Sequence, residues 1–198
     1  MPDLHTLSDH HDIRERVVPY SSAIDSCDFD ALDTVFTPDA AIDCRAMGGI
    51  AGRYPDVKAW LRTVLPRFPR YQHLVGNLSI RLDGDTARGR TICFNPMEVA
   101  LPDGGTQVMF LGLWYVDRFV RTAHGSRIAE RVEARCYGHN VPAGSPGRSA
   151  DPVMLRAPCD GCATRAASMH CVDRCVSRAG TRPRNARRMR RTRLPADG

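Results

Sequence analysis

Hydrophobic positions near the start of the chain recur at helical spacing. The apolar side chains fall four, three and four residues apart, at Ile13, Val17, Tyr20 and Ile24. This spacing places them on one face of an amphipathic helix over residues 8–25, with Ser8 or Asp9 as its cap. Pro19 lies inside the stretch and predicts a kink, because the apolar spacing resumes after it.

Two further helices are predicted before the first long strand. One is short, over residues 29–36, with Asp28 as its N-cap, and a short strand follows over residues 40–45. The other begins near Pro55 and ends at Pro66. Its apolar residues share one face: Val57, Trp60, Leu61, Val64 and Leu65.

After Tyr71 the spacing changes from helical to alternating, which predicts strands over residues 71–83, 86–99, 106–122 and 127–137. Tight turns join them into an antiparallel meander. Helices followed by antiparallel strands predict an α+β fold and exclude a parallel, doubly wound sheet. Strands of this length bend, so the sheet is expected to wrap the helices and leave a cavity.

For two of these strands, the sequence predicts which side chains lie on each face. On the last strand, the core face is predicted to hold Ile128, Val132 and Cys136, and the opposite face Arg127, Arg131 and Arg135. The strand over residues 106–122 is apolar on both faces. One face can serve a pocket, and we expect the other to form a homodimer interface.

The net charge of +6 belongs to the end of the chain. Residues 1–143 hold 16 basic against 18 acidic side chains, whereas residues 144–198 hold 12 arginines against 4 aspartates. We therefore expect a domain over residues 1–143 and a disordered Arg-rich tail over residues 144–198, with an out-of-frame extension of a GC-rich gene as the alternative. The tail could contact nucleic acid only without sequence preference.

Several classes of protein and site are not expected. The longest apolar run, nine residues from Val108 to Val116, is too short for a membrane span, which needs about 20 residues. No secretory signal is visible, so a cytoplasmic location with reduced cysteines is predicted. The tail's Cys159, Cys162, His170 and Cys175 have the residue types of a zinc site but lack a surrounding apolar pattern, and we expect no metal.

Four stretches of the sequence resemble one known family. They are YSSAIDSCDFDAL at 20–32, FTPDA at 36–40, RYQH at 70–73 and WY at 114–115. Together they resemble the SnoaL-like group of the nuclear transport factor 2 superfamily over about residues 8–141. The resemblance implies a cone-shaped fold in which three N-terminal helices pack on a strongly curved antiparallel sheet that encloses a pocket. Such folds often dimerise through the open sheet face.

The resemblance also suggests residues of a site. Against the scytalone dehydratases of this superfamily, Asp25 and His73 match the catalytic aspartate and histidine, while the second catalytic histidine falls near Val108 and the pocket tyrosine on Cys44. Against the ketosteroid isomerases, Tyr20 matches the tyrosine that binds the oxyanion, and the general-base aspartate falls on Cys44.

His73 is the expected general base, with Asp25 and Tyr20 assisting, because histidine can take a proton from carbon near neutral pH. In the alternative, His73 is an inert polar residue bonded to backbone or to Asp25, and Asp25 is a partly exposed residue capping the helix end. Strand alternation sets His73 opposite Leu74, so it reaches the pocket only if the lining face changes, as at a bulge near Gly76.

The expected substrate-binding residues are Cys44, Trp60, Phe110 and Trp114. The predicted function is a lyase or isomerase, dehydratase-like or cyclase-like, that works without a cofactor on a small hydrophobic carbonyl, polyketide or steroid-like compound. The alternative is a non-catalytic pocket protein of the same fold that binds such a compound.

Overall fold

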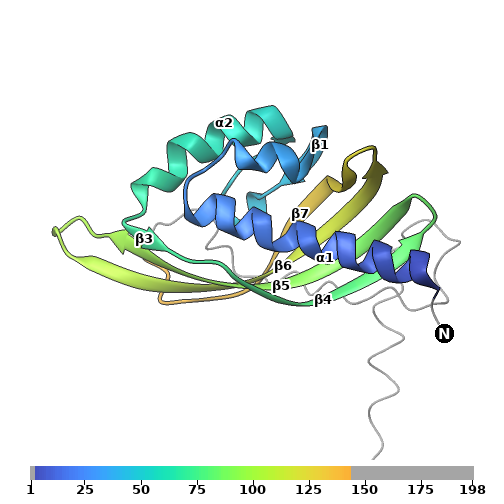
Figure 1. Cartoon of the computed structure of the whole chain (residues 1–198). Helices are drawn as coiled ribbons and strands as arrows, with labels where there is room; N and C mark the ends of the chain where they lie inside the picture. The colour runs from blue at the N-terminus through green and yellow to red at the C-terminus, as the bar shows by residue number, and fades with distance from the viewer. Residues whose placement is uncertain (1–2, 144–198) are drawn as a thin grey trace, which may run out of the picture. The chain divides into compact units, whose positions relative to one another are not determined.

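A computed structural model describes residues 3–143, and the predicted tail with its arginine and cysteine motifs lies outside the described residues. Within residues 3–143, two helices lie on one face of a long, curved sheet (Figure 1). The helical elements are α1 (Leu4–Asp25), η1 (Ala31–Thr34), η2 (Arg45–Met47), α2 (Tyr54–Val64) and η3 (Leu65–Arg67). The strands are β1 (Phe36–Asp43), β2 (Ala51–Arg53), β3 (Arg70–Tyr71), β4 (Leu74–Asp83), β5 (Thr86–Ala100), β6 (Thr106–Thr122) and β7 (Gly125–His139).

The sheet follows the order β2, β1, β7, β6, β5, β3, and β4 also pairs with β5. Consecutive long strands pair antiparallel, which confirms the predicted meander, and the sheet does not close on itself. Only the pairing between β1 and β7 is parallel among the described strands. The predicted α+β class is therefore confirmed.

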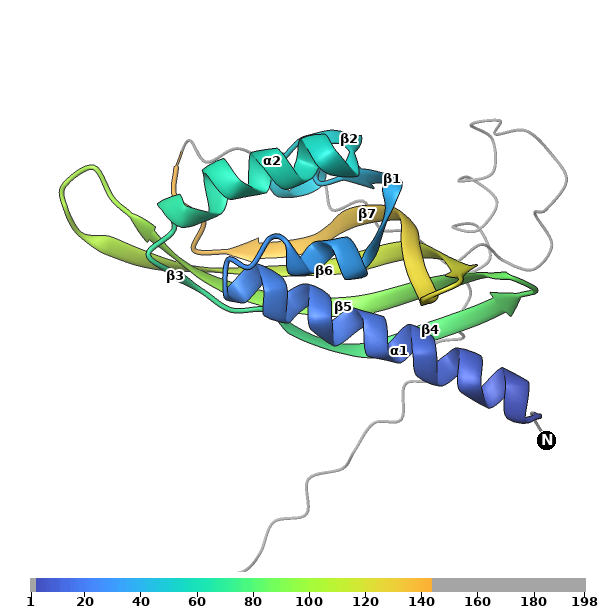
Figure 2. The same cartoon turned by 45° about the horizontal axis from the view of Figure 1, so that its top comes forward.

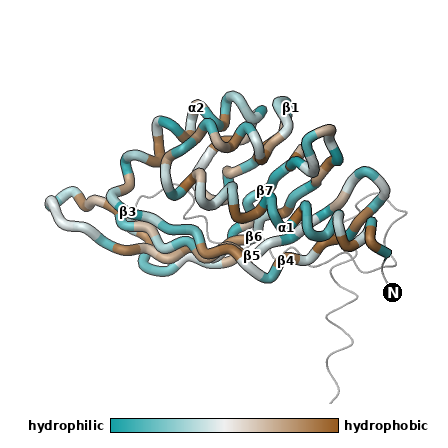
Figure 3. Tube along the Cα trace, viewed as in Figure 1, coloured by the Kyte–Doolittle hydropathy of each residue, from teal (hydrophilic) through white to brown (hydrophobic). Residues whose placement is uncertain are grey.

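The first helix begins earlier than predicted. Asp3, not Ser8 or Asp9, is the N-cap, because its Oδ1 accepts a hydrogen bond from the Thr6 amide at 2.8 Å. The apolar residues of α1 do face the sheet, since Ile13, Val17, Tyr20 and Ile24 are all buried. Hydrophobic and hydrophilic positions accordingly alternate along the helix in Figure 3.

The second predicted helix is wrong in kind and extent. The chain forms only the short 3₁₀ turn η1 and enters β1 at Phe36. Pairing with the last strand explains the early start, because the Ile128 amide donates to the Val35 carbonyl at 2.9 Å and Phe36 lies beside Ile128. A long-range backbone contact thus outweighs the local apolar spacing.

The third predicted helix is confirmed as α2, which has Pro55 in its first turn. It lies against β1, on the same side of the sheet as α1 (Figure 2). Its Trp60 and Leu61 face the space between helix and sheet. None of the helices in the described residues is long and apolar enough to cross a bilayer.

The faces predicted for the last strand are wrong beyond Ile128. Arg131 is 1% exposed and Val132 is 43% exposed, the reverse of the expectation. The pairing of β6 with β7 shifts after Ile128, so that Ala129 is an extra residue in β7. An extra residue moves the side chains that follow it to the other face, which carries Arg131 and Glu133 inward.

Candidate active site

His73 and Asp25 form a hydrogen-bonded pair between the end of α1 and the start of β4. The ring Nδ1 of His73 lies 2.6 Å from Asp25 Oδ1, and the His73 backbone amide donates to Asp25 Oδ2 at 2.9 Å. Both bonds hold one carboxylate, so the ring is fixed in position and in tautomer. Nδ1 carries the proton that Asp25 accepts, and Nε2 is left as the basic atom.

A third residue contacts the basic nitrogen. Asn95 of β5 lies with its Nδ2 3.0 Å from His73 Nε2, and with the proton on Nδ1 this nitrogen accepts from the amide. The Asn95 Oδ1 is buried and has no hydrogen-bond partner among the described residues. The side chain of His73 is only 8% exposed, so its chemistry is confined to the interior.

The strand after His73 changes face in the way that the sequence requires. The register of β4 against β5 shifts between Gly76 and Ser79, and Asn77 adopts a positive φ of 47°. Leu74 is consequently 67% exposed, while Leu78 and Ile80 pack on the core. This bulge lets His73 point inward, which resolves the conflict in the alternation pattern.

The paired histidine borders a cavity of about 210 Å³ between the helices and the sheet. Most of its wall is apolar and rich in flexible sulfur and aromatic side chains, among them Met47, Trp60, Phe68, Met97 and Met109. Methionine side chains adapt to irregular shapes, so the cavity suits a hydrophobic ligand of small size.

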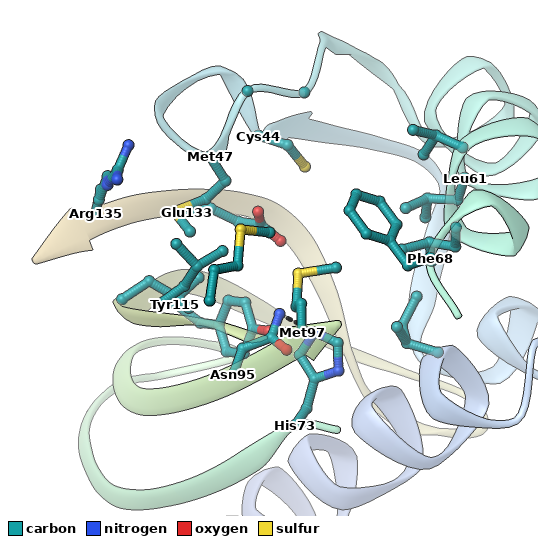
Figure 4. Close-up of a pocket in the computed structure, with 18 of the residues that line it drawn as sticks. Cys44, Met47, Leu61, Phe68, His73, Asn95, Met97, Tyr115, Glu133 and Arg135 are labelled. Carbon is teal, nitrogen blue, oxygen red and sulfur yellow. Dashed lines mark hydrogen bonds between the residues drawn. The ribbon is translucent and has the colours of Figure 1, made fainter. Parts of the chain in front are cut away.

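The polar part of the wall faces His73 across the cavity. Glu133 of β7 and Cys44, just after β1, direct their polar atoms into this space (Figure 4). The Tyr20 hydroxyl donates to Glu133 Oε1 at 3.4 Å. Desolvation raises the pKa of the Glu133 carboxyl, although Arg131 and His73 oppose the shift.

An ion pair lies behind this polar wall. Arg131 donates to both carboxylate oxygens of Asp117, each at 2.8 Å, and the two side chains are 1% and 0% exposed. The guanidinium also stacks over the rings of Tyr20 and Tyr115, at 4.0 and 4.2 Å from their centroids. Tyr20 is thereby held in place beside Glu133.

Cysteine chemistry is not favoured at this site. Burial is the largest cause that raises the pKa of the Cys44 thiol, followed by the nearby Glu133 carboxyl. The thiol form of Cys44 therefore serves as a wall residue and hydrogen-bond donor. Within residues 3–143, no group of three or more His, Cys, Asp or Glu side chains is arranged to hold a metal ion.

The structure brings together most of the residues that the sequence singled out. His73, Tyr20, Cys44 and Trp60 line the cavity, and Asp25 lies directly behind His73. Phe110 and Trp114 do not line it, because alternation along β6 turns them to the outer face. There Phe110 stacks on Phe94 with ring centroids 5.9 Å apart, and the Arg90 guanidinium lies 3.8 Å from the Trp114 ring.

Sequence reasoning missed Asn95, Glu133 and the Arg131–Asp117 pair. A signal for Asn95 was present, because it alternates with Cys93 and Met97 on the inward face of β5. Glu133 and Arg131 gave no such signal. Their inward direction depends on the extra residue in β7, which the apolar pattern does not reveal.

Comparison with known proteins agrees with this architecture. A family model described as a SnoaL-like domain matches residues 5–132. The uncharacterized protein Rv2910c of Mycobacterium tuberculosis is 58% identical over 131 residues, which cover 66% of this chain and 88% of the relative. The uncharacterized protein Mb2934c of Mycobacterium bovis gives the same values.

Solved structures share the fold at low sequence identity. A candidate scytalone dehydratase from Novosphingobium aromaticivorans is 16% identical with a TM-score of 0.63, over 76% of this chain and 96% of its own. The hexachlorocyclohexane dehydrochlorinase LinA-type3 from Novosphingobium barchaimii is 18% identical with a TM-score of 0.61, over 72% and 96%. With the family match spanning most of the domain, the chain belongs to the SnoaL-like domain family.

Proposed function

We propose that this protein is a lyase or isomerase that works without a cofactor on a small hydrophobic carbonyl compound. One observation carries the proposal: Asp25 holds the His73 imidazole at the edge of an apolar cavity through Nδ1, which leaves Nε2 as the atom that can act as a base. A base in this position can remove a proton from carbon beside a carbonyl group. The names of two structural neighbours, a dehydratase and a dehydrochlorinase, also describe eliminations.

The residues around His73 support a proton transfer in both directions. Once Nε2 takes a proton, the ring becomes a cation that the adjacent Asp25 carboxylate stabilises. Rotation of the Asn95 amide would then let its unpartnered Oδ1 accept a hydrogen bond from Nε2–H. The buried Asn95 side chain can thus form a hydrogen bond with His73 Nε2 in either protonation state of the imidazole.

The same contact supports a second candidate function. In the resting arrangement Asn95 donates to Nε2, so the basic atom is already hydrogen-bonded. If the amide keeps this position when a ligand enters, the cavity binds a hydrophobic compound without converting it. A binding protein of the same fold is therefore the alternative.

An exchange experiment on the full chain separates the two functions. Benzylacetone, a small aromatic ketone, is incubated with the protein in deuterated water, and deuterium at the carbons beside the carbonyl is followed by NMR. We expect catalysed exchange that His73→Ala abolishes and His124→Ala, an exposed turn histidine, retains. A thermal shift with benzylacetone but no catalysed exchange would favour the binding protein.

We also infer that the chain forms a homodimer through the outer face of the sheet. This face holds exposed apolar side chains from several strands, at Leu74, Val108, Val132 and Tyr137. Phe110 and Trp114 extend the same surface. Covering these side chains with a second copy would remove apolar area from water.

A further inference from the structure

Glu133 is an acidic group in the cavity that base catalysis by His73 leaves without a role. It comes from β7, on the far side of the cavity from His73, and its carboxyl is directed into the open space (Figure 4). The two groups are close enough to interact electrostatically, so that a proton on His73 would favour the ionised Glu133 carboxyl. The cavity therefore has a base at one wall and a carboxyl at the opposite wall.

Desolvation around Glu133 favours its neutral, protonated form. The buried Arg131 beside it already forms two hydrogen bonds with Asp117, so this ion pair is neutral as a unit. An ionised Glu133 would add a net negative charge to a desolvated region, which is costly. The groups that face Glu133 are Tyr20 on α1, Cys44 after β1, His73 before β4, Cys93 on β5, Tyr115 on β6 and Arg131 on β7.

Most of these neighbours are themselves neutral. Burial raises the pKa of Tyr20, Cys44 and Tyr115, and it raises the pKa of Cys93 to about 11. Arg135 also lines the cavity, but its guanidinium points away from Glu133 in Figure 4. Burial thus disfavours the charged form of Glu133 and of the tyrosine and cysteine side chains beside it.

We propose that Glu133 is a catalytic proton donor to a leaving hydroxyl, and that the substrate is a β-hydroxy carbonyl compound. The inference rests on the proposed function, because it needs His73 as the base. A ligand between the two walls presents its acidic C–H to His73 and its hydroxyl to Glu133. The apolar wall of Met47, Phe68 and Met97 receives the hydrocarbon part of the ligand.

The elimination balances with these two groups alone. His73 Nε2 takes the proton from the carbon beside the carbonyl, and the C–H electrons form the new C=C bond. The C–O bond breaks toward oxygen, which takes the Glu133 proton and leaves as water. The imidazolium then returns its proton to the carboxylate through water, which restores both resting forms.

The transient charge on Glu133 has partners already in place. The Tyr20 hydroxyl donates to its Oε1, and the hydrogen bond with the Cys44 thiol also favours the ionised carboxyl. The nearby Arg131 acts in the same direction. Tyr20 and Cys44 are therefore positioning residues that assist Glu133 as its proton leaves.

The first test is infrared spectroscopy of the full-length protein at neutral pH, without ligand. A protonated carboxyl has a carbonyl stretch separate from that of carboxylates. We expect this band in the wild type, its loss in Glu133→Gln and its retention in Glu130→Gln, which removes an exposed carboxyl from the same strand. A wild-type spectrum without the band would overturn the proposal.

The second test compares two reactions of one ligand type. The aldol adduct of acetone and benzaldehyde carries the leaving hydroxyl and yields benzylideneacetone, whereas benzylacetone lacks the hydroxyl and reports only proton abstraction. We expect Glu133→Gln to slow the elimination by about 10²-fold and to keep deuterium exchange into benzylacetone. His73→Ala should lose both reactions.

The outcomes distinguish the two proposals. Elimination by Glu133→Gln at the wild-type rate, with exchange intact, would overturn the donor role and leave the base in place. Absence of both reactions in the wild type would count against the proposed function. The infrared band, in contrast, tests only whether Glu133 is protonated. If Glu133→Gln does not fold, Glu133→Asp replaces it, and we expect it to keep the band with slower elimination.

Discussion

Asp25 accepts two hydrogen bonds from His73, at 2.6 Å from the ring Nδ1 and 2.9 Å from the backbone amide. The pair connects the last residue of α1 with the segment that enters β4, 48 positions later in the chain. A side chain held at both its ring and its backbone has little freedom to turn. This relationship makes His73 a fixed group on the cavity wall and is the basis of the first prediction.

Replacing Asp25 by Asn should slow proton abstraction without unfolding the domain. The amide no longer stabilises the imidazolium, and it can offer an N–H to Nδ1, which favours the wrong tautomer. We expect deuterium exchange into benzylacetone to fall by about 10²-fold. Asp28→Asn, which changes an aspartate outside the cavity, is the control. An unchanged exchange rate in Asp25→Asn would show that the pair is structural only.

Breaking the buried ion pair behind the site should destabilise the fold strongly. Arg131→Met leaves Asp117 as a buried charge without its partner, at a cost of about 3–5 kcal/mol in the free energy of unfolding. Urea denaturation measures this loss. The double variant Arg131→Met with Asp117→Leu should recover part of it, because no uncompensated charge remains. A double variant as unstable as the sum of the single ones would contradict the pairing.

The raised pKa of Glu133 predicts how stability depends on pH. A carboxyl whose folded pKa is raised contributes stability that is fully present below its unfolded pKa, about 4.3, and is lost as pH rises through the folded pKa. Gln does not titrate. The stability of Glu133→Gln relative to wild type should therefore increase from pH 4 toward neutral pH.

Urea denaturation across this pH range checks that trend. Glu130→Gln, at an exposed position of the same strand, is the matched control. If the difference between Glu133→Gln and wild type stays constant with pH, Glu133 does not titrate differently in the folded and unfolded states. The raised pKa would then be refuted independently of any ligand.

The outer sheet face should determine the oligomeric state. Val132 is 43% exposed on β7, among the apolar side chains proposed for the dimer interface. We expect the wild type to have the mass of a dimer by light scattering and Val132→Asp to shift it toward the monomer. Val18→Asp, at an exposed valine of α1 away from this face, should leave the mass unchanged. A monomeric wild type at micromolar concentration would contradict the interface.

Much of the architecture can be predicted from the spacing of apolar residues along the chain. The apolar periods of α1 and α2 and the alternation of the four long strands depend only on neighbours in the chain, so these elements are predictable. The family resemblance added the expectation that Asp25 assists His73. The short helix predicted over residues 29–36 failed because Val35 and Phe36 pair with Ile128, far away in sequence.

The composition of the cavity wall depends on contacts that no local pattern contains. A single extra residue in β7 turns Arg131 and Glu133 inward, and a shift near Gly76 turns His73 inward and Leu74 outward. The face of a strand reverses with one residue of register, and register is set by pairing with a neighbouring strand. The elements were thus determined by the order of residues, whereas the chemistry of the cavity was decided by how the strands pair.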